Sequence, residues 1–307
     1  MSNMVINTNI MALNSHNALK QVGNAQSTAA ARLSSGKKIN SAADDAAGLA
    51  ISEKMRAQIR GLDMGSKNAQ DGISLVQTAE GGLSQVDEMM QRIRELTVQA
   101  ANDTNTTDSV ESAANGNAPV TGDRSKVLTE VNQLIDEIGV TADRVKFNNR
   151  TLLDGSLAST KNFQLQVSAN KEDTAKPGVN LMQISVDIDL SSSTGIAGAL
   201  KTDLDNNFTA DSTSTDINKY LGTVDEQLTK VTTARATLGA YQNRLNYTIT
   251  ANDTTSENLS AASSRITDAD MATEMMNLTK ANVLQQAATS MLAQANQSPQ
   301  NILRLLQ

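Results

Sequence analysis

The sequence predicts a mainly α-helical protein: a long antiparallel helical bundle or coiled-coil rod with a small β-hairpin region and paired chain ends. Apolar residues recur at seven-residue intervals in two distant segments, which is typical of helices that pack along a seam. Only 3 of the 307 residues are proline, which permits very long helices. Aromatic residues make up 2% of the chain, too few to supply the large side chains that usually dominate a compact core.

The first long helix is expected over residues 45–100. Its seven-residue repeat consists of Met55, Leu62, Ala69, Val76, Leu83 and Met90. At about 1.5 Å per residue, such a helix is roughly 80 Å long. Its internal glycines each cost about 1 kcal/mol relative to alanine, so we expect partner helices to compensate for them.

A second array of similar length covers residues 223–266, with Asn252 in its one polar position. A companion series of positions follows each repeat position by four residues; Arg235 and Gln242 occupy its middle and stand between two apolar residues. A shorter third helix is indicated near residues 127–138 by apolar spacings of 4, 3 and 4. The apolar positions of the second array are Val224, Val231, Leu238, Leu245, Leu259 and Ile266, and those of the third helix are Val127, Val131, Leu134 and Ile138.

Two helix-start signals flank the long arrays. Ser41 with Asp44, and Thr267 with Asp270, have the Ser/Thr-x-x-Asp form in which a hydroxyl caps free helical N–H groups. We therefore interpret these four residues as helix caps. An acid/base pair at Asp44 and Asp45 is the alternative, but a helix start already favours negative charge for electrostatic reasons.

The two ends of the chain are matched in length, since 40 residues precede Ser41 and 40 follow Thr267. Each end carries an apolar helical stripe. One interpretation is a pair of amphipathic helices on a globular core. We favour a second, in which two arms dock against each other and against neighbouring molecules, because Ala-rich helices without aromatic residues bury too little surface to offset the entropy of ordering.

The middle of the chain has a different pattern. Residues 163–167 and 182–188 alternate apolar and polar side chains, as half-buried strands do, and Pro177 with Gly178 supplies a turn signal between them. A β-hairpin is therefore expected at about 163–188. The region 181–219, most of it rich in Ser, Thr, Asp and Asn, is predicted to be an exposed variable loop segment, and 102–122 is predicted to be a second exposed loop.

Composition excludes several classes of function. The chain has no Cys and a single histidine, His16, so disulfide scaffolds, zinc–thiolate sites and multi-histidine metal sites are excluded. With 26 basic and 33 acidic residues, and no basic stripe, it predicts no nucleic-acid partner. It has no apolar run long enough for membrane insertion. We expect no catalytic residue, cofactor or metal. The N-terminus lacks a signal-peptide pattern, which alone favours a cytoplasmic protein.

Five segments resemble bacterial flagellin. LSSGKKINSAADDAAGLAISEKMRAQIRGL (33–62) and SRITDADMATEMMNLTKANVLQQAATSMLAQANQSPQNILRLLQ (264–307) look like its two terminal signatures. QDGISLVQTAEGGL (70–83), QRIRELTVQAANDTNT (91–106) and FNNRTLLDG (147–155) are similar to flagellin as well. The likeness covers 1–155 and about 222–307, so the chain resembles a short form that lacks large outer domains.

This resemblance implies a domain organisation and a function. Residues 1–44 with 268–307 correspond to the terminal coiled-coil domain of the filament core, and 45–180 with 220–267 correspond to the rod domain. Such a protein self-polymerises into the flagellar filament for motility, is exported unfolded through the flagellar type III apparatus, and ends outside the cell. The implied partners are copies of itself, an export chaperone, the filament cap and the hook–filament junction proteins. A junction-type protein of the same apparatus is the alternative identity.

The resemblance also implies two sets of contact residues. Arg92 and Leu96 stand four residues apart on one helix face, and this patch is expected to contact a neighbouring subunit. In similar flagellins a host Toll-like receptor also contacts the matching patch, which here comprises Gln91, Arg92, Glu95, Leu96 and Glu130. The expected filament-core packing residues are Ile6, Ile10, Leu13, Leu19, Val22, Leu33, Leu278, Leu284, Met291, Leu292, Ile302, Leu303, Leu305 and Leu306.

Overall fold

The computed structural model describes residues 9–102, 122–155, 162–171, 178, 180–191, 195–208 and 213–305, with side chains described as far as residue 297. Within these ranges the chain is mainly helical, which confirms the expected fold class. The helices are α1 (Ile10–Ser35), α2 (Ala46–Ala100), α3 (Asp123–Arg144), α4 (Ile196–Asn207), α5 (Ser214–Thr267) and α6 (Met271–Leu305). The strands are β1 (Lys146–Phe147), β2 (Arg150–Thr151), β3 (Phe163–Gln166) and β4 (Leu181–Ile184).

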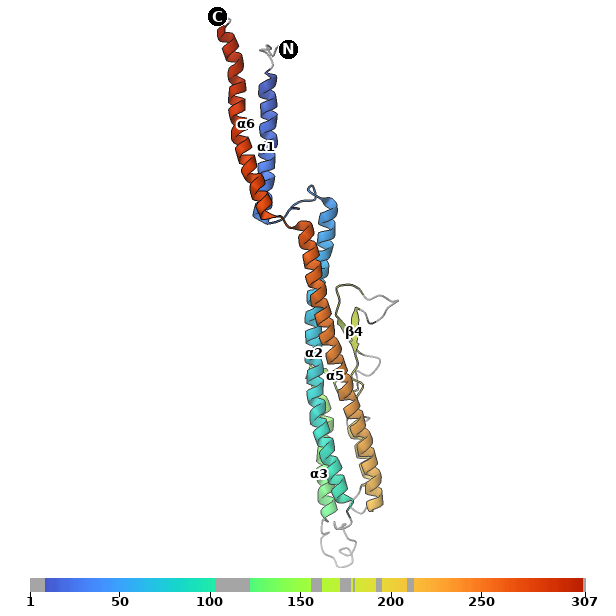
Figure 1. Ribbon diagram of the computed structural model, residues 1–307. Helices are drawn as coiled ribbons and strands as arrows, with labels where there is room; N and C mark the ends of the chain where they lie inside the picture. The colour runs from blue at the N-terminus through green and yellow to red at the C-terminus, as the bar shows by residue number, and fades with distance from the viewer. Residues whose placement is uncertain are drawn as a thin grey trace, which may run out of the picture. The chain divides into compact units, whose positions relative to one another are not determined.

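The chain divides into two compact units. The terminal unit comprises residues 1–59 and 256–307, and the central unit comprises residues 60–255. In the terminal unit, α1 and α6 lie side by side although they come from opposite ends of the sequence (Figure 1). In the central unit, parts of α2 and α5 form a bundle with α3 (Figure 1).

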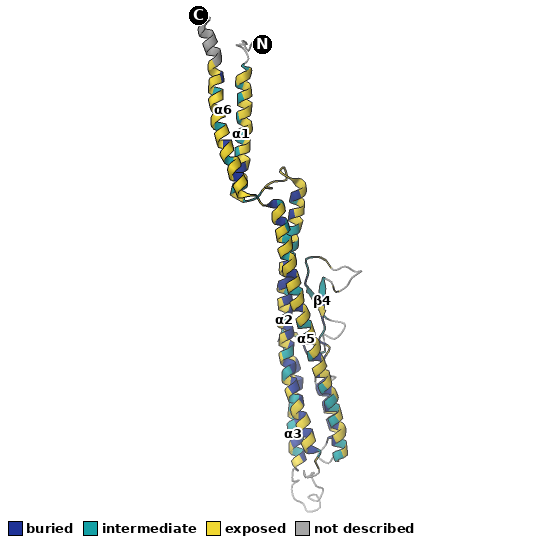
Figure 2. Ribbon diagram, in the orientation of Figure 1, coloured by how far each residue is buried: buried dark blue, intermediate teal, exposed yellow. Residues whose placement is uncertain are grey.

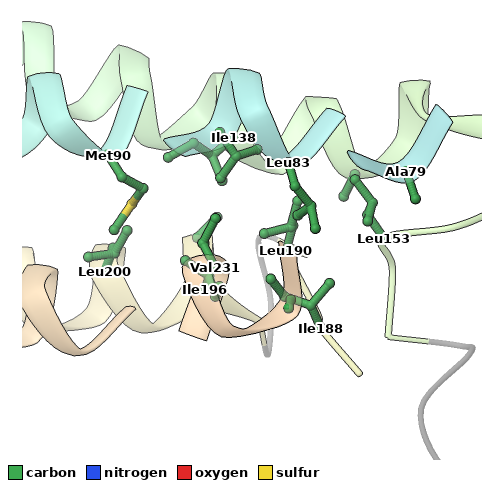
Figure 3. Packing of buried hydrophobic residues seen from close by; sticks show 14 of the residues in the cluster. Ala79, Leu83, Met90, Ile138, Leu153, Ile188, Leu190, Ile196, Leu200 and Val231 are labelled. Carbon is green, nitrogen blue, oxygen red and sulfur yellow. The ribbon is translucent and has the colours of Figure 1, made fainter. Parts of the chain in front are cut away.

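The core of the central unit is formed by the predicted seven-residue repeats. Leu83 and Met90 of α2 and Val224 and Val231 of α5 are fully buried in a single apolar cluster. Figure 3 shows Met90 pointing toward Leu200 of α4. Helices that share such a seam exclude water along their whole contact, so this cluster is the main source of stability in the central unit.

The prediction that 181–219 is an exposed loop is wrong for the described residues of that segment. Residues 196–207 form helix α4, and its side chains at spacings of four, Ile196, Leu200 and Leu204, are buried. Val186, Ile188 and Leu190 also join the core. The abundance of Ser, Thr, Asp and Asn hid a short amphipathic helix and an alternating strand-like run. Their apolar residues are few, but most of them are buried.

The expected β-hairpin is present, as an antiparallel pair in which Phe163 faces Ile184 and Gln166 faces Leu181. A second, smaller hairpin joins β1 to β2 through Asn148 and Asn149, whose φ angles are 47° and 63°. Two consecutive residues with positive φ are the signature of a tight two-residue hairpin turn, in which asparagine is well tolerated.

The β3–β4 hairpin packs closely against glycines of α2. A Cβ at Gly65 would lie 2.5 Å from the carbonyl oxygen of Val167, and one at Gly61 would lie 2.5 Å from the Cβ of Ala169. Two amides fasten the same segment: Asn68 donates to the Gln166 carbonyl at 2.8 Å, and Asn252 donates to the Val167 carbonyl at 2.7 Å. The segment that packs against these glycines is thus part of the hairpin, whereas we expected a partner helix there.

Candidate assembly and recognition surfaces

The paired terminal helices meet along a seam of small and half-buried side chains. On α1 the seam contains Leu19, Val22 and Leu33, which are half-buried, and Ala29, which is 4% exposed. On α6 it contains half-buried Leu278 and Leu292 together with two alanines that are each 5% exposed, Ala281 and Ala295. Positions of each helix that are not exposed recur at alternating spacings of three and four residues, as in a coiled coil: 12, 15, 19, 22, 26, 29 and 33 on α1, and 274, 278, 281, 285, 288, 292 and 295 on α6.

Polar contacts fix the register of this seam. Asn9 caps α1 by accepting a hydrogen bond from the Ala12 N–H, and its amide donates to the Ala295 carbonyl of α6 at 2.8 Å. Near the other end of the pair, Arg32 forms an ion pair with Glu274 at 3.2 Å, and the Glu274 side chain is only 11% exposed. An ion pair so largely shielded from water is costly to break from one side, so it favours a single alignment of the two helices.

The chain segments that connect the terminal helices to the rest of the terminal unit are also joined. Lys37 and Asp268 form an antiparallel bridge; the Lys38 N–H donates to the Thr267 carbonyl at 2.7 Å and the Ala269 N–H to the Gly36 carbonyl at 3.0 Å. Gly36 adopts a left-handed conformation, with φ of 68°, that ends α1. The two connecting segments are therefore held together by the backbone itself.

Aspartates begin the helices in this region. The carboxylate of Asp45 accepts a hydrogen bond from the Gly48 N–H at 2.9 Å at the start of α2, and that of Asp270 accepts from the Ala272 N–H at 3.0 Å at the start of α6. Hydrogen bonds from the Thr273 hydroxyl and from backbone N–H groups lower the pKa of Asp270. A carboxylate in this position satisfies free N–H groups and complements the helix dipole.

The expectation that the Ser41 and Thr267 hydroxyls cap helices is wrong. Ser41 and Asp44 form a turn before α2, in which the Asp44 carboxylate accepts the Ser41 N–H at 2.9 Å, and this bond contributes to a lowered pKa of Asp44. Thr267 is the last residue of α5, and its hydroxyl donates to the Ser263 carbonyl. Asp45, and not the predicted Asp44, caps α2, whereas the predicted Asp270 does accept a backbone N–H at the start of α6.

An apolar face of the terminal helices is left uncovered. Ile10 and Leu13 of α1 are 56% and 55% exposed, and Leu284 and Met291 of α6 are 45% and 58% exposed. Figure 2 shows that exposed residues dominate both helices. The predicted filament-core residues are therefore divided between the seam and this outward face. Ile6 and Leu306 lie outside the described residues, and Ile302, Leu303 and Leu305 fall in the part of α6 whose side chains are not described.

The predicted recognition patch forms a group of ion pairs between α2 and α3. Arg92 donates to Glu130 from Nε at 3.0 Å and from Nη2 at 2.9 Å, and from Nη1 to Glu95 at 3.4 Å. The hydrogen bonds and charge of Glu130 are the main cause of the raised pKa of Arg92. Gln91 is exposed and donates to Asp87 at 3.2 Å. About half of the Arg92 side chain faces solvent, so the group is accessible.

Leu96 does not belong to this surface. It is 2% exposed and lies in the central core cluster with Ile93 and Val131. A separation of four residues leaves a rotation of about 40° around the helix axis, which here carries the side chain from the solvent edge into the seam. The prediction that Leu96 is a contact residue is corrected accordingly, and burial in the central core explains its apolar character.

The described part of the chain offers contact surfaces and little material for chemistry. Within it, no three His, Asp or Glu side chains are grouped so as to hold a metal ion. None of the helices in the same ranges has both the length and the hydropathy needed to cross a bilayer. Exposed apolar faces on paired helices are typical of proteins that associate with further copies or partners.

Fold and surfaces together define a structural helical protein built for association. Residues 6–158 match the bacterial flagellin N-terminal helical region, and residues 221–306 match the bacterial flagellin C-terminal helical region. The chain therefore belongs to the bacterial flagellin family, a family of structural proteins and not of enzymes. Its members are subunits of the flagellar filament, which is extracellular, as the resemblance implied and contrary to what the N-terminus alone favours.

Individual relatives agree with this assignment. The chain is 45% identical to a flagellin of Bacillus subtilis (strain 168) over 317 residues, covering 99% of this chain and 100% of the relative. It is also 45% identical to a flagellin of Halalkalibacterium halodurans over 303 residues, with the same coverage. A solved structure described as a flagellar hook-associated protein from Vibrio parahaemolyticus aligns with a TM-score of 0.53 over 73% of this chain and 100% of that one, at 16% identity. That likeness concerns the fold alone and does not favour a junction-type protein.

Proposed function

We propose that this filament subunit polymerises through the outward apolar face of its terminal unit, which packs against the same unit of neighbouring copies. The observation that carries the proposal is the exposure of Ile10, Leu13, Leu284 and Met291 on helices that are already paired with each other. Large apolar side chains in water gain stability when a partner covers them. A family of filament subunits makes further copies of the chain the natural partner.

Polymerisation by electron microscopy is the direct test. A chain with Ile10→Ser and Leu284→Ser should lose filament formation under conditions in which the unmodified chain makes long filaments. Val140→Ser, which alters an exposed apolar residue of α3 that is 41% exposed, serves as the control and should polymerise. Normal filaments from the double variant would contradict the proposal, and short capped stubs from the unmodified chain would favour a junction-type protein.

The division of labour proposed for the filament follows the resemblance. Residues 1–44 with 268–307 line the filament core, and 45–180 with 220–267 form the surrounding rod. Two compact units support a division of this kind, although their boundaries, at 59/60 and 255/256, fall within α2 and α5. The fold of residues 196–207 adds that segment to the rod as packed structure.

The same apolar face accounts for the partners proposed before assembly. An export chaperone that covers α6 would keep exposed apolar residues from associating early, while the chain leaves through the flagellar export apparatus to meet the junction proteins and the cap. Deletion of residues 301–307 should stop filament growth and leave the central unit folded, as judged by its thermal unfolding. Normal filament growth after this deletion would count against a role for that segment.

A second role is carried by the ion pairs around Arg92, which we propose as a contact for a host Toll-like receptor. In support, Arg92, Glu95 and Glu130 converge on an accessible surface. Arg92→Ala should weaken receptor binding of the monomer by about 1–2 kcal/mol if it is an anchor. Arg94→Ala is the matched control, because Arg94 is similarly exposed but pairs with Asp225 of α5. If Arg92→Ala binds the receptor as tightly as Arg94→Ala and the unmodified chain do, only a subunit-contact role remains for Arg92.

A further inference from the structure

Several methionines of the terminal helices are exposed. Met90 and Met182 in the central core are at most 1% exposed, which is the usual environment of this apolar side chain. The exposed methionine face, by contrast, consists of Met11 at 47%, Met271 at 47%, Met275 at 53%, Met276 at 66% and Met291 at 58% exposure. Its thioether groups are therefore open to small solutes in the unassembled chain.

The surroundings of these side chains link them to the proposed packing surface. Met275 and Met276 line a shallow groove of α6 together with Val283 and Leu284. Met11 and Met291, from the two paired helices, line a second hollow. Met11 and Met291 lie beside Ala295 at the edge of the α1–α6 seam, whereas the groove that holds Met275 and Met276 is lined by α6 residues alone, so a change in their polarity acts on exposed positions of the helix pair.

We propose that the exposed methionine face is an oxidation site through which peroxides control assembly; this inference rests on the proposed packing function. The thioether sulfur attacks one oxygen of hydrogen peroxide: an S–O bond forms, the O–O bond breaks, and the proton of the attacked oxygen passes to the departing hydroxide, which leaves as water. Sulfur is oxidised by two electrons and the peroxide is reduced by two. The sulfoxide is polar, so it makes a surface that has to be desolvated at a subunit contact unfavourable to bury.

The site acts before assembly. An oxidised monomer keeps its folded central unit but is not incorporated, whereas methionines covered within a filament are shielded from the oxidant. Methionine sulfoxide is reduced enzymatically, by one reductase for each sulfoxide epimer, so the block is reversible. Leucine is the natural control residue, because it has similar volume and helix propensity and cannot be oxidised in this way.

Hydrogen peroxide applied to the monomer tests the proposal. Three chains are compared: the unmodified protein, a variant with all five methionines changed to leucine, and Met64→Leu, which removes a methionine of the central unit that is 53% exposed. Mass spectrometry measures the sulfoxide at each position, and sedimentation measures the polymerised fraction. Oxidation should slow polymerisation of the unmodified protein and of Met64→Leu about tenfold or more, and that of the five-leucine variant less than about twofold.

Two results would overturn the proposal: an equal loss of polymerisation in the five-leucine variant, or normal polymerisation of monomers oxidised at all five positions. If the unoxidised five-leucine variant does not polymerise, reduction of the oxidised unmodified protein by the two reductases decides, since recovery supports the proposal and no recovery overturns it. Peroxide footprinting of preformed filaments separately tests the packing function, because it asks only whether the five methionines are protected relative to Met64.

Discussion

The central and terminal units are built from similar long helices but differ in what those helices bury. Leu83, Val224 and Val231 of the central unit are fully buried, whereas the leucines of the α1–α6 seam are half-buried and its best-buried residues are alanines. Helical stability in proteins comes mostly from packing of an apolar face. The comparison teaches that the central unit closes a large apolar core within one chain, while the paired helices of the terminal unit leave several large apolar side chains exposed.

Truncation of a leucine in each unit should give the largest difference between the units in lost unfolding free energy. Leu83→Ala removes a fully buried side chain and should destabilise the central unit by about 2–5 kcal/mol. Leu33→Ala in the α1–α6 seam removes a half-buried one and should cost roughly 1 kcal/mol. Denaturant unfolding of the monomer, followed with a probe in each unit, measures both values. Equal costs would remove the energetic contrast.

Glycine-to-alanine substitutions should change the stability of the two units in opposite directions. Gly65→Ala in the central unit should destabilise by about 1–3 kcal/mol, because its Cβ would lie 2.5 Å from the backbone oxygen of Val167. Gly23→Ala in α1 of the terminal unit has nothing within 4 Å of the new Cβ and should stabilise that helix by about 1 kcal/mol. Thermal unfolding compares the two, with Gly81→Ala as an unobstructed control in α2. If Gly65→Ala stabilised the central unit, the hairpin would be able to move away from the new Cβ without a loss of stability.

The turn between β1 and β2 offers a smaller gain within the central unit. Asn149→Gly should stabilise it by about 0.5–1 kcal/mol, since the φ of 63° at this position is free of strain for glycine. Asn148→Gly, at φ of 47°, is the companion variant. Thermal melts of the monomer would reveal the shift, and a loss of stability in both variants would show that the asparagine side chains contribute more than the backbone conformation.

Acid should weaken the terminal unit more than the central one, by a modest amount. Hydrogen bonds lower the pKa values of Asp44, Asp268 and Asp270 in the terminal unit, and that of Asp216 in the central unit. A carboxyl with a lowered folded-state pKa contributes stability above its unfolded pKa, near 4, and loses it as the pH falls through the folded value. Unfolding midpoints measured from about pH 5 to about pH 2 should therefore fall more for the terminal unit, and less steeply in Asp270→Asn. An unchanged slope in that variant would exclude the cap as a contributor.

The sequence predicted what depends on periodic apolar spacing. The long helices, their buried repeat and the β3–β4 hairpin follow from such spacing, whereas Arg92 and Glu130 were grouped only by the resemblance to flagellin. Leu96 was misplaced because a four-residue separation does not say which side of a helix faces the core. Burial of α4 was missed because polar composition outweighed three correctly spaced apolar residues.

Polar exceptions within the repeats were visible in the sequence, but their purpose was not. Asn252 breaks the second array because its amide holds the hairpin at Val167. Arg235 does so because it pairs with Glu80 and Asp87 of α2, each at 3.0 Å. In both cases the partner is distant in sequence, and no local pattern identifies it. The assembly and receptor roles of the surface residues remain predictions for the experiments above.

Pairing of α1 with α6 also determines when the terminal unit can fold. The hydrogen bond from Asn9 to Ala295 spans 286 residues, and that from Gln26 to Asn282 spans 256. Ribosomes add about 5–20 residues per second, so α1 emerges on the order of tens of seconds before its partner exists. Closing so long a loop also carries a large entropy cost that nearby contacts do not. Helix α1 thus waits for more than 250 further residues to be synthesised before its native neighbour α6 is available.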